Sequence, residues 1–172
     1  MNTKNPLEVW LRGPVPEIIF YLQPVVHALM QAREEVNEMT QDFTNDLLWE
    51  KPGRVASAGF HLQHLTGVLD RLFTYARGEA LNDEQLQKLA AEGNPESSEQ
   101  TVQSLVQSFN QQVECAIQQL QKTIDSDLSE TRFVGRSKIP STVLGLLFHA
   151  AEHTQRHVGQ LFVTINVLRN LP

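Results

Sequence analysis

The sequence predicts an all-α protein: a four-helix bundle with a long crossover that carries a short helix between the second and third long helices. Apolar residues recur at three- and four-residue steps along four long segments, which is the period of an amphipathic helix. Almost nothing alternates with the two-residue period of a strand, so no sheet is expected. Glycine, proline and capping residues separate the four segments.

The first two helices are predicted on either side of a breaker. Pro24 suits the first turn of a helix, and the apolar residues after it keep helical spacing as far as Met39. Residues 49–53 interrupt the pattern. A second helix is predicted over residues 57–77, and Gly78 stands where a helix-ending glycine belongs. Its expected core face is Leu65, Leu69, Leu72 and Ala76.

The crossover and the third long helix follow. Asn82 and Gln85 resemble a capping pair, which opens a short helix that ends near Gly93. An apolar run from Val102 to Ile124 predicts the third long helix, whose opposite face is rich in glutamine and solvated.

The last long helix is expected after a loop over residues 126–140. Ser141 is predicted to cap this helix, which reaches about Leu168. Its expected apolar stripe is Leu144, Leu147, Phe148, Ala151, Val158, Leu161, Phe162 and Ile165.

Composition places the chain among soluble single-domain proteins. Its 172 residues suit one domain over 1–172, and 41% hydrophobic and 20% charged residues are ordinary globular values. A net charge of −6 without a basic run disfavours nucleic-acid binding. Residues 1–6 lack the apolar core of a signal peptide, and no apolar stretch is long enough to span a membrane. The lone Cys115, expected to be buried, fits a reducing compartment, so a cytoplasmic location is predicted.

The six histidines carry the chemical signal, because all of them fall on predicted long helices. His149, His153 and His157 are four residues apart and form one ridge, on which an adjacent pair could chelate a metal ion. A histidine pair at this spacing is about as likely to be solvated surface or packing residues as it is to be a ligand pair. On the second helix, His61 falls in the middle of the apolar face and His64 at its edge.

Two stretches resemble the DinB-like superfamily of metal-binding four-helix bundles: GFHLQHLTG at residues 59–67 and AEHTQRHVGQ at residues 151–160. In that superfamily one histidine of the second helix and two of the fourth bind the metal. The resemblance therefore implies His64, His153 and His157 as ligands. His61 and His149 are additional histidines beside the motif.

Three imidazoles suit one divalent transition-metal ion such as zinc, nickel or iron, and they leave positions open for water or substrate. The resemblance implies a metal-dependent enzyme that activates water or a low-molecular-weight thiol, as a hydrolase or S-transferase of a small molecule. The alternative is a non-catalytic, metal-stabilised dimeric bundle that acts in a stress response. A ferritin-like di-iron site is set aside, because no glutamate precedes a histidine by three residues.

The remaining candidates surround this proposed site. His149 is a second base, a fourth ligand or a polar helix residue, and Gln160 is a candidate for orienting a ligand or water. Glu152 is expected to be solvated and His61 to be a packed core residue. Basic residues around Phe133 either form a solvated loop or receive an anionic substrate. A homodimer is expected by default, since two-fold dimers are the commonest oligomers.

Overall fold

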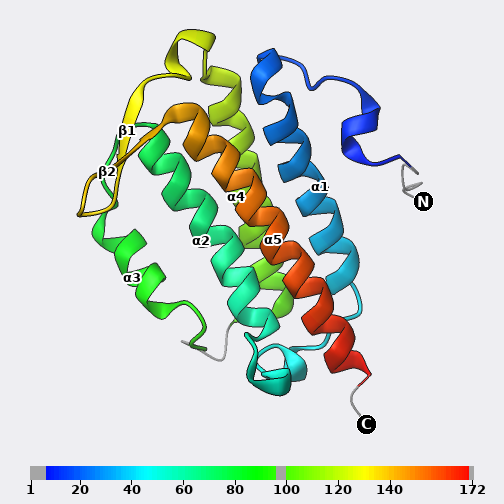
Figure 1. The fold of residues 1–172 in the computed structure, drawn as a ribbon. Coiled ribbons are helices and arrows are strands. Elements are labelled where there is room, and N and C mark those ends of the chain that lie inside the picture. The colour runs from blue at the N-terminus through cyan, green and yellow to red at the C-terminus, as the bar shows by residue number, and fades with distance from the viewer. Residues whose placement is uncertain (1–6, 96–99, 171–172) are drawn as a thin grey trace.

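The computed structural model describes residues 7–95 and 100–170 (Figure 1). Within them lie four long helices and a shorter one: α1 (Gln23–Thr40), α2 (Ala58–Ala76), α3 (Asp83–Ala91), α4 (Val102–Lys122) and α5 (Val143–Arg169). Short 3₁₀ segments cover Val9–Arg12, Phe20–Leu22, Asn45–Leu47, Pro52–Arg54 and Asp125–Asp127. The predicted all-α class and the short helix in the crossover are confirmed. Residues 1–6, where the sequence predicts no signal peptide, lie outside the described residues.

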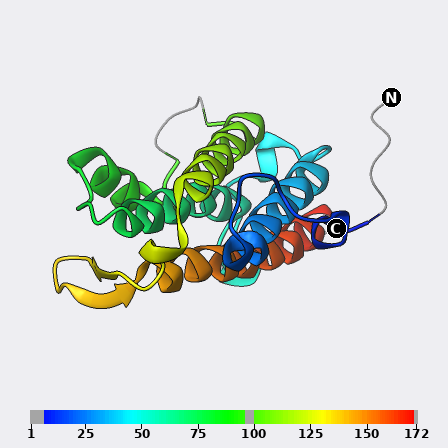
Figure 2. The ribbon, with the colours of Figure 1, turned by 90° about the horizontal axis from the view of Figure 1, so that it is seen from above.

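In the bundle of four long helices, α1 packs against both α4 and α5, and α2 also packs against both α4 and α5. In Figure 1, α1 and α5 run in one direction and α2 and α4 in the other. Because α2 and α4 are parallel neighbours, the chain must return along the bundle between them, and α3 makes that return against α2. This explains the long crossover. Figure 2 shows the segment before α1 and the region of α3 on opposite sides of the bundle.

Helix starts follow local hydrogen bonding. The predicted capping pair is present: Asn82 and Gln85 each accept the other's backbone N–H through a side-chain oxygen. The predicted cap of the last helix is wrong by one residue. Thr142, not Ser141, caps α5, and its hydroxyl accepts the N–H of Gly145 at 3.0 Å. Ser141 belongs to the strand that precedes the helix.

A β-hairpin replaces the expected loop before α5. Strands β1 (Thr131–Val134) and β2 (Ile139–Thr142) pair antiparallel and project from the bundle on the side of α3 (Figure 2). Gly135 and Lys138 both take a positive φ at the turn, where the Lys138 N–H donates to the Gly135 carbonyl. Each strand has only four residues, and no residue in either strand is fully buried. The sequence therefore shows no alternation of apolar and polar residues that would predict a strand. The expectation of no sheet is therefore wrong.

The buried face of α5 also differs from the predicted stripe. Leu144, Phe148 and Phe162 are 38%, 62% and 54% exposed. At about 100° per residue, the observed core face is turned by roughly 60° from the predicted one, toward the histidine ridge. His153 and His157 are consequently half-buried. The buried residues are Val143, Leu146, Leu147, Ala150, Ala151, Thr154, Val158, Leu161, Thr164, Ile165 and Leu168.

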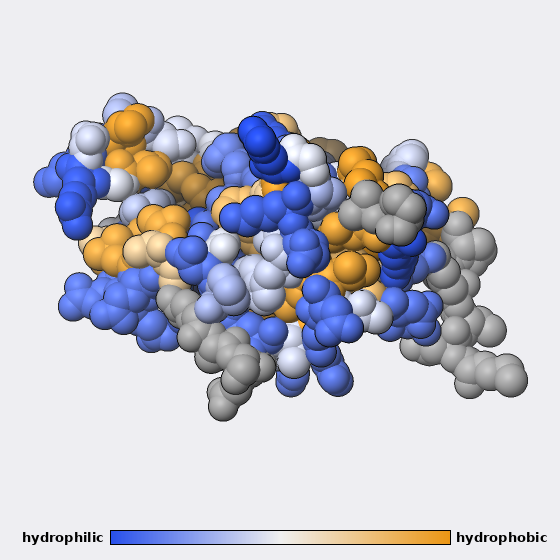
Figure 3. Space-filling model, turned by 90° about the horizontal axis from the view of Figure 1, so that it is seen from below, coloured by the Kyte–Doolittle hydropathy of each residue, from blue (hydrophilic) through white to orange (hydrophobic). Residues whose placement is uncertain are grey.

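Three further observations concern the surface of the protein. Cys115 is exposed, contrary to its expected burial, because it lies on the glutamine-rich face of α4 between the buried Val113 and Ala116. Seen from below, hydrophobic residues form separate patches among hydrophilic ones (Figure 3). None of the described helices is both long enough and apolar enough to cross a membrane.

Candidate metal centre

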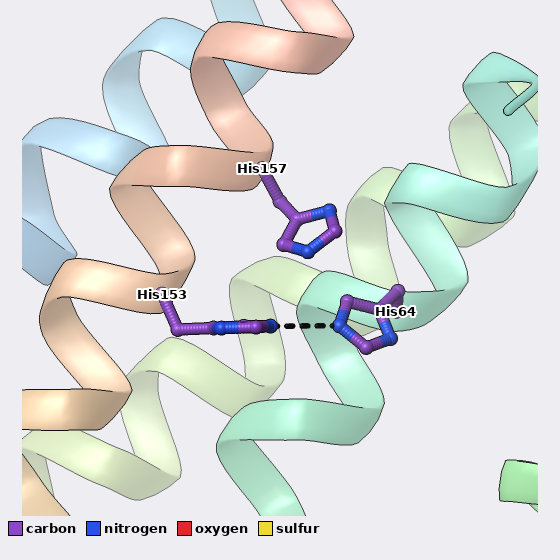
Figure 4. A group of neighbouring side chains, drawn as sticks. All are labelled: His64, His153 and His157. Atoms are coloured by element: carbon purple, nitrogen blue, oxygen red, sulfur yellow. Dashed lines mark hydrogen bonds between the residues drawn. The ribbon is translucent and has the colours of Figure 1, made fainter. Parts of the chain in front are cut away.

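The three histidines implied as ligands come together between α2 and α5. His64 lies on α2, and His153 and His157 lie one turn apart on α5 (Figure 4). One nitrogen of each ring lies within 4.8 Å of the others, and the Nε2 atoms of His64 and His153 are 3.0 Å apart. Three imidazole nitrogens at this spacing are a donor set that a transition-metal ion accepts.

The outer nitrogen of His64 contacts a carboxylate. Its Nδ1–H donates to Glu92 Oε2 at 2.6 Å, which leaves the Nε2 lone pair toward the other two histidines. The Phe60 ring stacks on the His64 ring with centroids 5.4 Å apart and planes 12° from parallel. The hydrogen bond and the stack together fix the orientation of this imidazole.

Glu92 is itself held by a cation. Its other oxygen, Oε1, accepts a hydrogen bond from Arg71 Nη1 at 2.6 Å. Burial acts to raise the pKa of Glu92, but the hydrogen bonds from His64 and Arg71 outweigh it, so the pKa is lowered and the carboxylate stays ionised. The sequence does not single out Glu92, because this residue follows a short crossover helix and no spacing rule relates it to His64, 28 positions away.

The outer nitrogen of His157 contacts His61. The two Nδ1 atoms lie 3.1 Å apart, within hydrogen-bond distance. When His157 is the donor of this bond, its Nε2 keeps the lone pair that a metal ion needs. His61 is 4% exposed, as expected of a core residue. Its ring nevertheless contacts the histidine group through His157. Burial, followed by charge on His64, lowers the pKa of both His61 and His157 from 6.5 to about 4. Both rings are therefore neutral at pH 7.

His153 has the least complete hydrogen bonding of the three. Its Nδ1 is buried and has no hydrogen-bond partner within the described residues. Burial is the largest of the effects that lower its pKa. The other nitrogen of His153, Nε2, faces the Nε2 of His64, so His153 is oriented as a ligand that would bind a metal ion through Nε2.

The remaining candidates lie around this group. His149 is half-exposed, and its Nδ1 contacts Glu152 Oε1 at 3.0 Å. Glu152, expected to be solvated, is 34% exposed and also pairs with Arg156 at the surface. With His153, these two residues form a second group that could hold a metal ion. Gln160 is exposed and lines a surface hollow of about 520 Å³ that reaches His61.

Two other features are not brought to the site. His27 lies on α1 and its Nε2 contacts the Gly13 carbonyl at 3.1 Å. The basic residues around Phe133 line a separate hollow of about 800 Å³, which has no histidine among its described lining residues. They are Arg132, Arg136 and Lys138, and Arg132 also donates to Glu130 and the Ala76 carbonyl.

Comparison with known proteins points to one family. The sequence profile of the DinB superfamily matches residues 28–161. The crystal structure of a DinB-like protein from Bacillus cereus superposes with a TM-score of 0.62 over 83% of this chain and 89% of that one, at 14% identity. At that identity the likeness concerns the fold. No curated protein matches the sequence.

Proposed function

Because the chain belongs to the DinB superfamily, we propose that it binds one divalent transition-metal ion through His64, His153 and His157. The observation that supports this most directly is the convergence of three imidazole nitrogens within 4.8 Å of one another. Zinc, nickel and iron all accept neutral imidazole ligands. The lowered pKa of His153 and His157 keeps their lone pairs available at neutral pH.

We further propose a metal-dependent enzyme that acts on a small molecule. Among the described residues, no fourth histidine, cysteine or carboxylate joins the group of three. An ion held by three side chains offers an open position, where it lowers the pKa of bound water or of a low-molecular-weight thiol. A hydrolase or a thiol S-transferase is the reaction class that follows.

The surrounding side chains have distinct roles in this proposal. His61 holds the Nδ1 of His157, and Glu92 holds the Nδ1 of His64. His149 lies one turn before His153 and is accessible to solvent, so it is the candidate proton acceptor. Gln160 is exposed near His61 and is the candidate for orienting a ligand or bound water.

Metal analysis of protein purified without a histidine tag tests the central claim. We expect close to one equivalent of a divalent transition metal per chain, with affinity that falls as pH drops and the imidazoles protonate. Protein that is metal-free at neutral pH and takes up no metal on titration would refute it. X-ray absorption should show an exchangeable ligand, and the loaded protein should then be screened with thiols and electrophilic acceptors.

A non-catalytic, metal-stabilised homodimer is the second candidate function. It is favoured by the exposed apolar side chains of α5, which a partner could cover: Leu144, Phe148, Phe162, Val163 and Val167. A fourth protein ligand in the X-ray absorption spectrum, with a dimer in light scattering, would support it over catalysis. A homodimer in the cytoplasm is compatible with either function.

A further inference from the structure

The carboxylate of Glu92 is built into the bundle between an imidazole and a guanidinium. Both of its oxygens are used, since Oε2 accepts from His64 and Oε1 accepts from Arg71. The side chains of Glu92, Arg71 and His64 are only 9%, 11% and 16% exposed. Water therefore competes little for these hydrogen bonds, and the charge of Arg71 compensates the buried carboxylate.

A glycine on α2 provides the room for this ion pair. A Cβ atom at Gly67 would lie 2.5 Å from Glu92 Oε1 and 2.6 Å from Arg71 Nη1. Both distances are well inside van der Waals contact, so any other residue at Gly67 would displace the ends of the two side chains. Gly67 lies inside a helix, where glycine is otherwise unfavourable. Its presence there is explained by the ion pair.

The turn after α3 places Glu92. Gly93 adopts a φ of +84°, the left-handed conformation that ends many helices. Its N–H donates to Gln63 Oε1 at 2.7 Å, which ties the turn to α2 beside His64. The crossover is thereby held against α2 by two contacts beside His64: Gly93 with Gln63, and Glu92 with Arg71.

We propose that Glu92 is a positioning residue for the metal site, and that Arg71 and Gly67 hold it in place. By accepting the Nδ1–H, Glu92 keeps His64 in the tautomer whose Nε2 lone pair faces His153 and His157. A carboxylate in this position also makes the imidazole a stronger ligand. The inference rests on the proposed metal site, but the tautomer of His64 can be measured without any metal.

Zinc affinity, measured by competition with a chromophoric chelator, is the first test. Glu92→Gln keeps an acceptor for His64 but loses the charge, and Glu92→Leu loses both. We expect losses of about 10- to 100-fold in zinc affinity, larger for the leucine variant. The matched control is Glu84→Gln, a glutamate of the preceding helix α3 that pairs with Lys88 in solvent. It should bind zinc as the wild type does.

The His64 tautomer is the second readout, and a merely structural salt bridge would not change it. Long-range ¹H–¹⁵N spectra of metal-free wild type at pH 7.5 should show His64 protonated at Nδ1. In Glu92→Leu the proton should redistribute toward Nε2. If the tautomer is unchanged in that variant, or zinc affinity stays within twofold of wild type, the proposal is overturned.

Gly67→Ala provides an independent test that leaves Glu92 itself in place, should the Glu92 variants fail to fold. Displacing the ion pair should weaken zinc binding in the same direction as Glu92→Gln. Gly159→Ala is the control, because a Cβ there meets nothing within 4 Å. Equal zinc affinity in Gly67→Ala and wild type would contradict the proposal. If wild type binds no metal while the tautomer results hold, the proposed function fails, and what stands is that Glu92 fixes the tautomer of His64.

Discussion

Two His–Glu–Arg triplets lie near the histidine group, and they differ mainly in burial. The buried triplet consists of His64, Glu92 and Arg71, and its glutamate contacts lie at 2.6 Å with side chains 16%, 9% and 11% exposed. The exposed triplet consists of His149, Glu152 and Arg156. Its contacts lie at 3.0 and 2.9 Å, with side chains 48%, 34% and 56% exposed.

The same three residue types therefore have different effects in the two triplets. Solvent and salt screen the exposed triplet, and pairs of this kind contribute little to stability. In the buried triplet the carboxylate has lost its water, so losing either partner leaves a poorly compensated charge. The exposed triplet comes from one helix, whereas the buried one joins α2 to the crossover. Burial, more than residue identity, separates a surface ion pair from a support for the site.

The largest expected difference between the triplets concerns their histidines. His64→Ala should abolish stoichiometric metal binding, because two imidazoles on one helix make a much poorer site. His149→Ala and His61→Ala should retain close to one equivalent. Elemental analysis of the three purified variants measures this. Loss of metal in His61→Ala with retention in His64→Ala would show that the ligand is one helical turn away from the proposed one.

The glutamates should differ next, in the stability of metal-free protein. Glu92→Gln should lower the free energy of unfolding by about 2 kcal/mol, less than the usual cost of breaking a buried ion pair, because glutamine keeps an oxygen acceptor for His64. Glu152→Gln should leave the urea midpoint of unfolding unchanged. Equal midpoints for the two variants would mean that burial does not separate the triplets.

A pH effect should arise from His61, which contacts the ligand group from the core side. Its pKa is 6.5 in the unfolded reference and about 4 when folded. The unfolded chain therefore binds the proton first, so its contribution to stability is intact above pH 6.5 and is lost as pH falls toward 4. The loss is up to about 3 kcal/mol over that interval. Urea unfolding of metal-free wild type and His61→Leu from pH 4 to 7.5 should show a flatter dependence in the variant.

The same residue should matter at neutral pH through its hydrogen bond. His61→Ala should lower the free energy of unfolding by roughly 1 to 3 kcal/mol, since it removes a buried partner of His157. Thermal unfolding at pH 7.5 gives the value. No change in melting temperature would indicate that the contact between the two rings contributes nothing to the fold.

The smallest effect is expected at Cys115, which belongs to neither triplet. Cys115→Ser should leave metal content and any activity nearly unchanged, because the thiol is exposed on α4. This variant sets the baseline against which the other changes are judged. Loss of activity with an intact fold would instead make Cys115 a candidate nucleophile.

Sequence reasoning succeeded where the signal was local. The helical spacing of His153 and His157 and the capping pair at Asn82 are read within one or two turns. The ligand set as a whole came from family resemblance, and its role in metal binding stays a prediction.

The features that the sequence does not predict depend on contacts between segments that are distant along the chain. Nothing near Glu92 indicates that it faces Arg71 and His64, because the path of the crossover decides that contact. The exposure of Phe148 and Phe162 was missed because α5 is apolar around much of its circumference, so periodicity alone did not fix which side is buried.

The separation of the site's two halves along the chain has a consequence for folding. His64 and His153 are 89 residues apart in sequence, and α3, α4 and the hairpin lie between them. An ion bound at the proposed site would close that segment into a loop, much as a cross-link does, and a link of this length removes about 4.6 kcal/mol of chain entropy from the unfolded state. All three histidines could bind the ion only after α2 and α5 had come together. Metal uptake would then follow folding, and its release would accompany the opening of α2 from α5.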